Sequence, residues 1–235
     1  RQLPSLTHIA RYGTGVDIVD VDAATAAGVL VTNVPAAYCD AEVADHAVAM
    51  LLHFNRKLRA YDRATHAGQW QWQSAAPVHR LAACTVGIVG LGHIGRQIAR
   101  RVAAFGPTVC AYDPYMNPAD VPAGVSLVDF EKFLASCDYI LIQAPLTEGT
   151  RDLFDASVIS KMKPGSVLIN TSRGPIVNEA ALIDALKSGQ LAAAGLDDLA
   201  EEPAKLRHWR PDSPLFAFDQ CLITPHVAYY SEESI

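Results

Sequence analysis

Short apolar runs rich in β-branched residues recur along the chain, and stretches with helical periodicity separate them. The runs predict strands over residues 7–10, 29–32, 85–89, 109–112, 139–143, 166–170, 191–195 and 221–223. Strands that alternate with helices form parallel sheets with helices on both faces. The sequence therefore predicts an α/β protein built on a doubly wound parallel sheet.

The longest helical pattern runs from residue 40 to residue 66, after the turn-forming residues Asn33, Val34 and Pro35. We expect one long helix here, placed to link two domains. The segment that follows is both aromatic and polar, with Trp70 and Trp72 between glutamines. It is either an arm that contacts another molecule or a loop on the surface of its own chain, and the sequence leaves both open.

A glycine-rich turn follows the strand predicted at residues 85–89 and leads into a helical pattern. Its residues are Gly90, Leu91, Gly92, His93, Ile94 and Gly95. Such a turn lets the backbone approach a pyrophosphate at the N-terminus of the next helix. Asp113 ends the next predicted strand, where a carboxylate accepts hydrogen bonds from the ribose hydroxyls and repels a 2′-phosphate. The pattern predicts a Rossmann-type site that prefers NAD to NADP.

Composition narrows the functional classes. The 235 residues are 50% hydrophobic and carry a net charge of −6 without a basic block, so we expect neither nucleic acid nor a membrane as partner. No apolar run approaches the about 20 residues of a membrane span, and no leader pattern is visible, so we expect a cytoplasmic protein. The five cysteines are scattered and lack a CxxC spacing, which predicts reduced thiols and no metal site.

Candidate catalytic residues lie in the second half of the chain. Arg173, Asp197 and His226 each follow one of the last three predicted strands, and Glu202 lies between the last two. Ligands of open α/β sheets bind at the carboxyl ends of the strands. Reduction of a 2-keto acid needs a cation for its carboxylate and carbonyl and a proton donor for the developing alkoxide. Each residue alone fits an ordinary surface position, but together, beside a nucleotide site, they indicate this chemistry.

Stretches along nearly the whole chain resemble one family. They are residues 11–17, 43–47, 90–95, 145–147, 170–174, 195–203 and 224–234. In them the chain resembles the D-isomer-specific 2-hydroxyacid dehydrogenases, and within these the group of the C-terminal-binding proteins and the phosphoglycerate dehydrogenase-like enzymes. The resemblance implies a Rossmann NAD domain with part of a flavodoxin-like substrate domain.

The resemblance also implies residue roles. Arg173 is expected to bind the substrate carboxylate and carbonyl, His226 to be the general acid and base, and Glu202 to pair with His226. Further substrate contacts are expected from Arg11, Gly13 and Tyr229. The residues expected around the cofactor, with Asp197 at the nicotinamide carboxamide, are Thr14, Gly90, Gly92, His93, Ile94, Gly95, Asp113, Ala144, Pro145, Thr150, Thr171 and Asp197.

The chain departs from the family pattern at two positions and in extent. His93 stands where many members have Arg or Lys, and Tyr229 stands where the C-terminal-binding group has a tryptophan. We expect residues 1–38 to be a remnant of the substrate domain, residues 39–228 to form the NAD domain and residues 229–235 to begin the return to the substrate domain. We therefore expect the chain to be part of a longer working protein.

The expected activity is interconversion of a D-2-hydroxy acid and its 2-keto acid, with NAD, on glyoxylate- or hydroxypyruvate-like substrates or on 3-phosphoglycerate. The alternative is an NAD(H)-sensing, corepressor-like binding protein, which would need none of Arg173, Glu202 and His226. A formate dehydrogenase is disfavoured because that branch has glutamine in place of Glu202. The resemblance also predicts a homodimer formed through the NAD domain, with the long helix and the Trp70–Trp72 segment as contacts.

Overall fold

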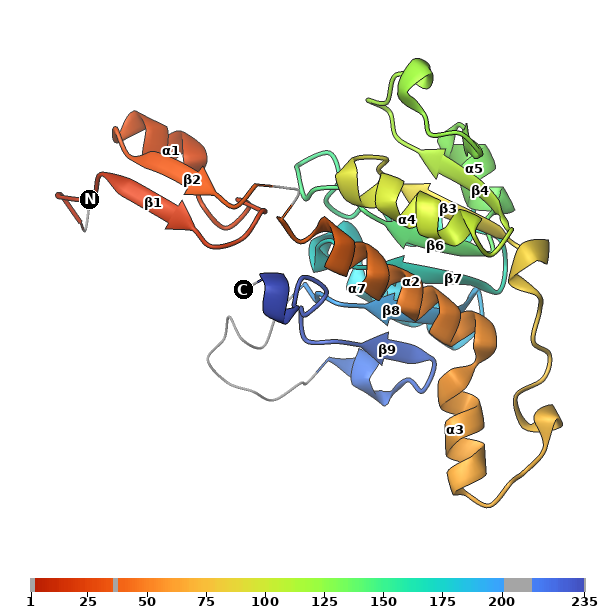
Figure 1. Ribbon diagram of the computed structural model, residues 1–235. Helices are drawn as coiled ribbons and strands as arrows, with labels where there is room; N and C mark the ends of the chain where they lie inside the picture. Colours follow the sequence, from red (N-terminus) through yellow and green to blue (C-terminus); the bar gives the residue numbers. More distant parts are fainter. Residues whose placement is uncertain (1–2, 36–37, 201–212, 235) are drawn as a thin grey trace.

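The computed structural model describes residues 3–35, 38–200 and 213–234. Its centre is a seven-stranded sheet in the order β5-β4-β3-β6-β7-β8-β9, in which every neighbouring pair is parallel (Figure 1). The strands are β3 (Thr85–Val89), β4 (Thr108–Tyr112), β5 (Val125–Leu127), β6 (Tyr139–Ile142), β7 (Ser166–Asn170), β8 (Leu191–Leu196) and β9 (Cys221–Ile223). The prediction of a parallel α/β sheet is confirmed.

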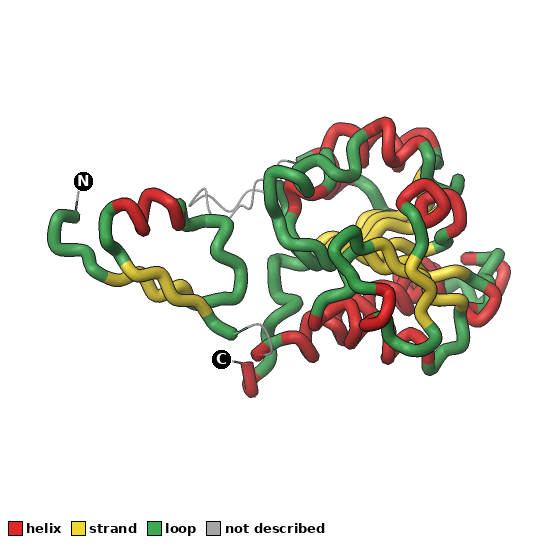
Figure 2. Tube along the Cα trace, turned by 90° about the horizontal axis from the view of Figure 1, so that it is seen from above, coloured by secondary structure: helices red, strands yellow, loops and turns green. Residues whose placement is uncertain are grey.

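Helices cover both faces of this sheet (Figure 2). One face carries α2 (Asp40–Arg56) and α4 (His93–Ala103), and the other carries α5 (Phe130–Ser136), α6 (Ala156–Ser160) and α7 (Glu179–Ser188). Side chains alternate along β6, so that Ile140 and Ile142 pack with α5, α6 and α7 while Leu141 packs with α2 and α4. Because both faces are buried, the strands are continuous apolar runs, which is why the pattern located them.

The sequence analysis missed β5, which lies at the edge of the sheet beside β4. This strand has three residues, and all of them are partly or fully exposed. A strand that is short and half-exposed does not need an apolar run. The hydrophobic pattern therefore carries no signal for it.

The prediction of one helix over residues 40–66 is wrong. The chain forms two helices, α2 and α3 (Leu58–His66), which are separated by Lys57 in a left-handed conformation with a φ of 52°. In α2 the apolar side packs on the sheet, whereas α3 buries none of its residues and points away from the sheet (Figure 1). Arg59 anchors α3 by donating to the carbonyl oxygens of Asp219 and Cys221. No Gly or Pro marks the break at Lys57, so the sequence pattern does not locate it.

A second, smaller sheet lies apart from the seven-stranded sheet (Figure 1). It pairs β1 (His8–Arg11) with β2 (Leu30–Asn33) in parallel, and α1 (Val21–Ala26) connects them. Oδ1 of Asp20 accepts a hydrogen bond of 2.8 Å from the N–H of Ala23 and so caps α1. We call residues 3–35 the N-terminal region; its exposed large aliphatic residues are Leu3, Ile18, Val21 and Leu30.

Short 3-10 helices complete the described chain. They are η2 (Trp72–Ala75), η3 (Leu81–Ala83), η4 (Pro118–Asp120), η5 (Gly174–Ile176), η7 (Pro214–Ala217) and η8 (Glu232–Ser234). Within the ranges described here, no helix combines the length and the apolar character needed to cross a membrane. All five cysteines are free thiols, as predicted.

Candidate active site

The glycine-rich turn joins β3 to α4. Gly90 has a φ of 87°, and a Cβ there would lie 2.7 Å from the carbonyl oxygen of Gln143. A Cβ at Gly95 would collide with the carbonyl oxygen of Gly90, so α4 begins directly against the turn. A Cβ at Gly92 would enter open space instead. The first N–H groups of a helix have no partner within it, so this cradle fits an anionic group such as a pyrophosphate.

Asp113 lies directly after β4 and contacts the glycine-rich turn. Its Oδ2 accepts a hydrogen bond of 2.8 Å from the N–H of Leu91, and its Oδ1 accepts one of 3.0 Å from the N–H of Tyr115. Each carboxylate oxygen has a second lone pair for a further donor. Asp113 can therefore hold the turn and still accept hydrogen bonds from a ribose.

His93, at the start of α4, has a partner that the sequence analysis missed. Its Nδ1 lies 3.8 Å from Oδ2 of Asp40, the first residue of α2. Burial raises the pKa of Asp40, and the charge of His93 offsets part of that rise. The imidazole is mostly exposed, whereas the carboxylate beside it is buried.

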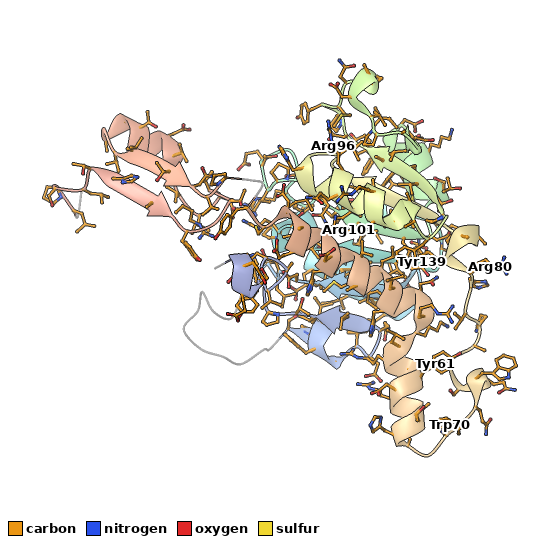
Figure 3. All side chains as sticks on the ribbon, in the orientation of Figure 1. Tyr61, Trp70, Arg80, Arg96, Arg101 and Tyr139 are labelled. Carbon is orange, nitrogen blue, oxygen red and sulfur yellow. The ribbon has the colours of Figure 1, made fainter. Side chains whose placement is uncertain are left out.

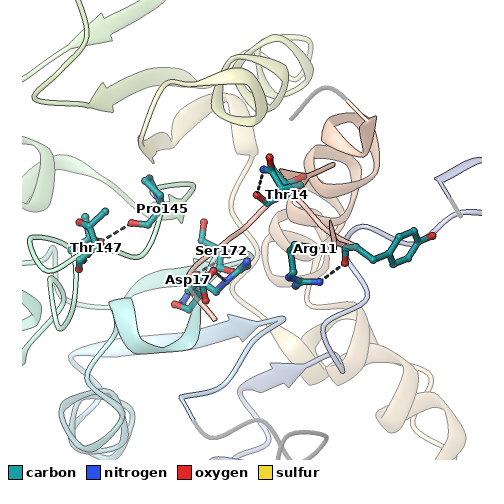
Figure 4. Close-up of polar contacts among 11 residues, drawn as sticks. Arg11, Thr14, Asp17, Pro145, Thr147 and Ser172 are labelled. Carbon is teal, nitrogen blue, oxygen red and sulfur yellow. Dashed lines mark hydrogen bonds and ion pairs between the residues drawn. The ribbon is translucent and has the colours of Figure 1, made fainter. Parts of the chain in front are cut away.

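The loop after β6 is tied to the end of β7. Nε2 of Gln143 donates to Oγ1 of Thr171 at 2.6 Å. Within the loop, Oγ1 of Thr150 donates to the carbonyl oxygen of Pro145 at 2.6 Å and accepts from the N–H of Thr147 at 2.7 Å. Pro145 and Thr147 lie close together in this loop (Figure 4). These contacts give a defined shape to two segments that were predicted to touch the cofactor.

A buried asparagine shapes the backbone around Arg173. Nδ2 of Asn170, the last residue of β7, donates to the carbonyl oxygen of Arg173 at 2.8 Å. Its Oδ1 accepts from the N–H of Ser172 at 3.0 Å. Gly174 comes next, and a Cβ there would collide with the backbone of Leu199. The segment that carries Arg173 is thus held by hydrogen bonds and by close packing.

The side chain of Arg173 meets the N-terminal region. Its Nε donates to Oδ1 of Asp17 at 3.1 Å, and its Nη1 donates to the carbonyl oxygen of Ser172 at 2.8 Å. Figure 4 shows Asp17 beside Ser172. The structure therefore brings the predicted substrate arginine against a carboxylate more than 100 residues away in the sequence.

Asp197 organises the turn that carries His226. Its buried carboxylate accepts hydrogen bonds from the hydroxyl of Thr224 at 2.5 Å and from the N–H groups of Val227 and Ala228 at 3.0 and 2.9 Å. Its carbonyl oxygen accepts from the N–H of His226 at 2.7 Å. One residue at the end of β8 thus holds the turn after β9.

His46 on α2 extends this network, and the sequence analysis did not assign it a role. Its Nε2 lies 3.0 Å from Oγ1 of Thr224 and 3.7 Å from Oδ1 of Asp197. The Thr224 hydroxyl donates its only hydrogen to Asp197, so Nε2 of His46 must be the donor in the first contact. The tautomer of His46 is fixed by this chain of hydrogen bonds.

His226 has a strained backbone and an aromatic neighbour. Its φ of 54° lies in the left-handed region, which costs a non-glycine residue on the order of 1–3 kcal/mol. Its ring meets that of Tyr229 edge to face, with centroids 6.3 Å apart. Glu202, its predicted partner, lies outside the described residues.

Arg11 and Thr14 lie at the end of the N-terminal region that approaches this site (Figure 4). Nη1 of Arg11 donates to the carbonyl oxygen of Tyr12, while its Nε is buried without a hydrogen-bond partner among the described residues. A Cβ at Gly13 would lie 2.9 Å from Nη1 of Arg11. Thr14 accepts a hydrogen bond of 2.7 Å from Nδ2 of Asn33 through its carbonyl oxygen.

Comparison with known proteins identifies the family to which this architecture belongs. Residues 48–228 match the family model of the D-isomer specific 2-hydroxyacid dehydrogenase, NAD binding domain. The chain belongs to the D-isomer specific 2-hydroxyacid dehydrogenase family. The matched part of this family member is its NAD-binding domain, and NAD(H) is its cofactor.

Individual relatives agree with the family model. The D-3-phosphoglycerate dehydrogenase of Mycobacterium leprae is 43% identical over 232 residues, which cover 98% of this chain and 42% of that protein. The glycerate dehydrogenase of Methylorubrum extorquens is 37% identical and covers 100% of this chain and 73% of that protein. The D-lactate dehydrogenase of Aquifex aeolicus, solved with NAD and lactic acid, has a TM-score of 0.92 and 30% identity, over 99% of this chain and 73% of that one. The chain thus spans about two-fifths of the length of the first of these relatives.

Sequence reasoning missed five residues of this family member that shape the site: Asp17, Asp40, His46, Gln143 and Asn170. Each acts by contacting a residue that is far away in the sequence or by bonding the backbone. Asp17, His46 and Asn170 lie within the stretches that carry the family resemblance, so a signal for these three was present. The resemblance did not indicate which residues they contact.

Proposed function

We propose that the protein interconverts a D-2-hydroxy acid and its 2-keto acid with NAD(H). The observation that carries this proposal is the convergence of Arg173, Asp197 and His226. They follow β7, β8 and β9, which are neighbours and parallel, so their side chains come to one edge of the sheet. The glycine-rich turn after β3 lies at the same edge.

The proposed roles follow from the chemistry of each side chain. Arg173 holds the substrate carboxylate and polarises the carbonyl, for which a planar guanidinium with several N–H donors is suited. His226 donates a proton to the developing alkoxide in reduction and removes it in oxidation. Glu202 pairs with His226. NAD(H), when bound, supplies or accepts the hydride.

Further substrate contacts are assigned to Arg11, Gly13 and Tyr229. The buried Nε of Arg11 lacks an acceptor among the described residues, and an anionic substrate would provide one. The edge-to-face contact of Tyr229 with the His226 ring supports an aromatic wall beside the proton donor. Residues assigned to the cofactor are Thr14, Gly90, Gly92, His93, Ile94, Gly95, Asp113, Ala144, Pro145, Thr150, Thr171 and Asp197.

The substrate class proposed is a small 2-keto acid of the glyoxylate or hydroxypyruvate kind, or the couple of 3-phosphoglycerate. It is supported by the activities of the relatives, which include D-3-phosphoglycerate and glycerate dehydrogenases. The corepressor alternative has less support, because these relatives are enzymes. We also propose a cytoplasmic location and no direct contact with nucleic acid, in line with the net charge of −6.

We further propose a homodimer formed through α3 and the Trp70–Trp72 segment. No residue of α3 is buried, and Trp70 and Trp72 are 88% and 72% exposed. The hydroxyl of Tyr61 donates to the carbonyl oxygen of Trp72 at 2.8 Å, so the segment is fastened to α3 (Figure 3). Exposed aromatic side chains on a fixed scaffold are typical of protein interfaces. A Trp70→Ala, Trp72→Ala variant should be monomeric when its mass is measured by light scattering.

The test of the activity is NADH oxidation by the full-length protein with a panel of 2-keto acids. Glyoxylate, hydroxypyruvate and 3-phosphohydroxypyruvate should support turnover, with one clearly preferred. Formate should not support the reduction of NAD by this protein. Absence of turnover with every 2-keto acid, by a protein that binds NADH, would contradict the proposed activity and favour the NAD(H)-sensing alternative.

A further inference from the structure

The guanidinium of Arg173 lies in a cradle made by two residues of the N-terminal region, Asp17 and Gly15. Asp17 accepts the Nε–H at 3.1 Å, and both side chains of this ion pair are 21% exposed. On the other side, Nη1 donates to the carbonyl oxygen of Ser172 at 2.8 Å. The guanidinium is planar, so two hydrogen bonds in different directions, from Nε and from Nη1, fix its orientation.

Gly15 provides the space for the third nitrogen. A Cβ at this position would collide with Nη2 of Arg173 and would lie 2.8 Å from Oδ1 of Asp17. The φ of Gly15 is outside the left-handed region, so its backbone does not require glycine. Glycine is therefore needed at position 15 because the guanidinium of Arg173 occupies the space that a side chain would fill. Among the described residues, Nη2 makes no hydrogen bond.

We propose that Asp17 is a positioning residue for the substrate-binding Arg173, and that Gly15 is the gap in which the guanidinium is held. The inference rests on the proposed function. Asp17 occupies Nε and leaves Nη2 and the outer N–H of Nη1 for the substrate, which presents its carboxylate and carbonyl oxygens together. Because Asp17 lies in the N-terminal region and Arg173 follows β7 of the seven-stranded sheet, the arginine is correctly oriented only when the N-terminal region lies against that sheet.

The experiment compares variants of the full-length protein by steady-state kinetics and by oxalate binding to the NADH complex, followed through NADH fluorescence. A misplaced catalytic group costs about a hundredfold, so Asp17→Ala should lower kcat/KM by about 10- to 100-fold and weaken oxalate binding. Asp17→Asn keeps an acceptor for Nε and should restore most of the loss. Gly15→Ala should act like Asp17→Ala. The affinity for NADH itself should not change in any of these variants.

Asp20→Ala is the matched control. Asp20 is a carboxylate of the same segment, but it caps α1 and is not bonded to Arg173. It should leave kcat/KM and oxalate binding unchanged, even where it lowers stability.

Three results would overturn the proposal. Unchanged kinetics and oxalate binding in Asp17→Ala would show that Arg173 needs no support. An equal loss of NADH affinity that Asp17→Asn does not restore would indicate a general structural role. If the unmodified protein neither turns over a 2-keto acid nor binds oxalate, the proposed function fails and the inference fails with it. If the unmodified protein is active and Arg173→Ala is inactive, the proposed function stands, and the Asp17 variants then test the inference alone.

Discussion

The seven-stranded sheet and the N-terminal region are both parallel α/β structures, but they bury their side chains differently. Every residue of β7 is buried, and helices cover both faces of its sheet. In β1 and β2 every residue is partly or fully exposed. Burial of apolar surface contributes about 25 cal/mol per Å², so only the larger sheet gains much stability from its own packing.

The contacts between the two regions are of another kind. The Arg173–Asp17 ion pair joins them, and it is polar and only partly buried. Such pairs contribute little to stability but have a defined geometry. The seven-stranded sheet is therefore stabilised by its core, whereas the N-terminal region contributes by positioning a few side chains, such as Asp17 beside Arg173.

The strongest test of this comparison is the replacement of one apolar strand or helix residue by alanine in each region. Phe133 is fully buried and contacts the aromatic rings of Tyr112 and Phe130, so Phe133→Ala should lower the free energy of unfolding by about 3–5 kcal/mol. Leu30 in β2 is 61% exposed, and Leu30→Ala should change the free energy of unfolding by no more than about 0.5 kcal/mol. Denaturation of the 235-residue chain measures both. Equal losses would refute the comparison.

A second test addresses the residue at which the regions meet. Arg173→Lys keeps the charge but loses the planar set of donors, so kcat/KM for the 2-keto acid should fall by about a hundredfold or more. Arg101→Lys is the matched control, because Arg101 is 22% exposed and also pairs with an aspartate, Asp45, away from the site. Steady-state kinetics decide. A variant at position 173 that keeps most of its kcat/KM would remove Arg173 as the substrate clamp.

A third test concerns the larger sheet alone. Asp113→Ala should weaken NAD binding by about tenfold and narrow the preference over NADP, because the ribose loses an acceptor and a 2′-phosphate loses its repulsion. Asp129→Ala, which removes the N-cap of α5 and not a ribose contact, serves as control. Titration of each variant with NAD and with NADP measures both affinities. Unchanged affinity and preference would show that Asp113 only holds the N–H groups of Leu91 and Tyr115.

The smallest effect is expected where α2 begins. Burial raises the pKa of Asp40, so the folded state binds its proton more tightly than the unfolded state does. Its ionised form then lowers stability at neutral pH, and this cost disappears as the pH falls below the unfolded pKa of about 3.9. Asp40→Asn should therefore raise the free energy of unfolding by about 0.5 kcal/mol at neutral pH, and not in acid.

Asp22→Asn is the control for this test. Asp22 also lies in the first turn of a helix, α1, but it is exposed, so the change should bring no gain at neutral pH. Denaturation at several pH values measures both variants. A gain for Asp40→Asn that persists unchanged in acid would rule out burial of its charge as the cause.

Much of the fold could be predicted because a sheet covered on both faces needs continuous apolar strands. The residues of β6 and the middle of β7 are such runs, and Gly90 and Gly95 leave no room for a side chain. The edge strand β5 and the break at Lys57 could not be predicted. Both depend on what packs nearby, and no local residue type marks them.

The sequence by itself determined the parallel α/β architecture, the glycine-rich turn and the strand ends at which Arg173, Asp197 and His226 lie, since these follow from local periodicity and from residues with special backbone properties. The tertiary structure decided which side chains meet. Only folding brings Asp17 to Arg173, His46 to Thr224 and Asp40 to His93. The physical reason is that a hydrogen bond or an ion pair depends on distances of a few ångströms between side chains, and the order of residues along the chain does not contain those distances.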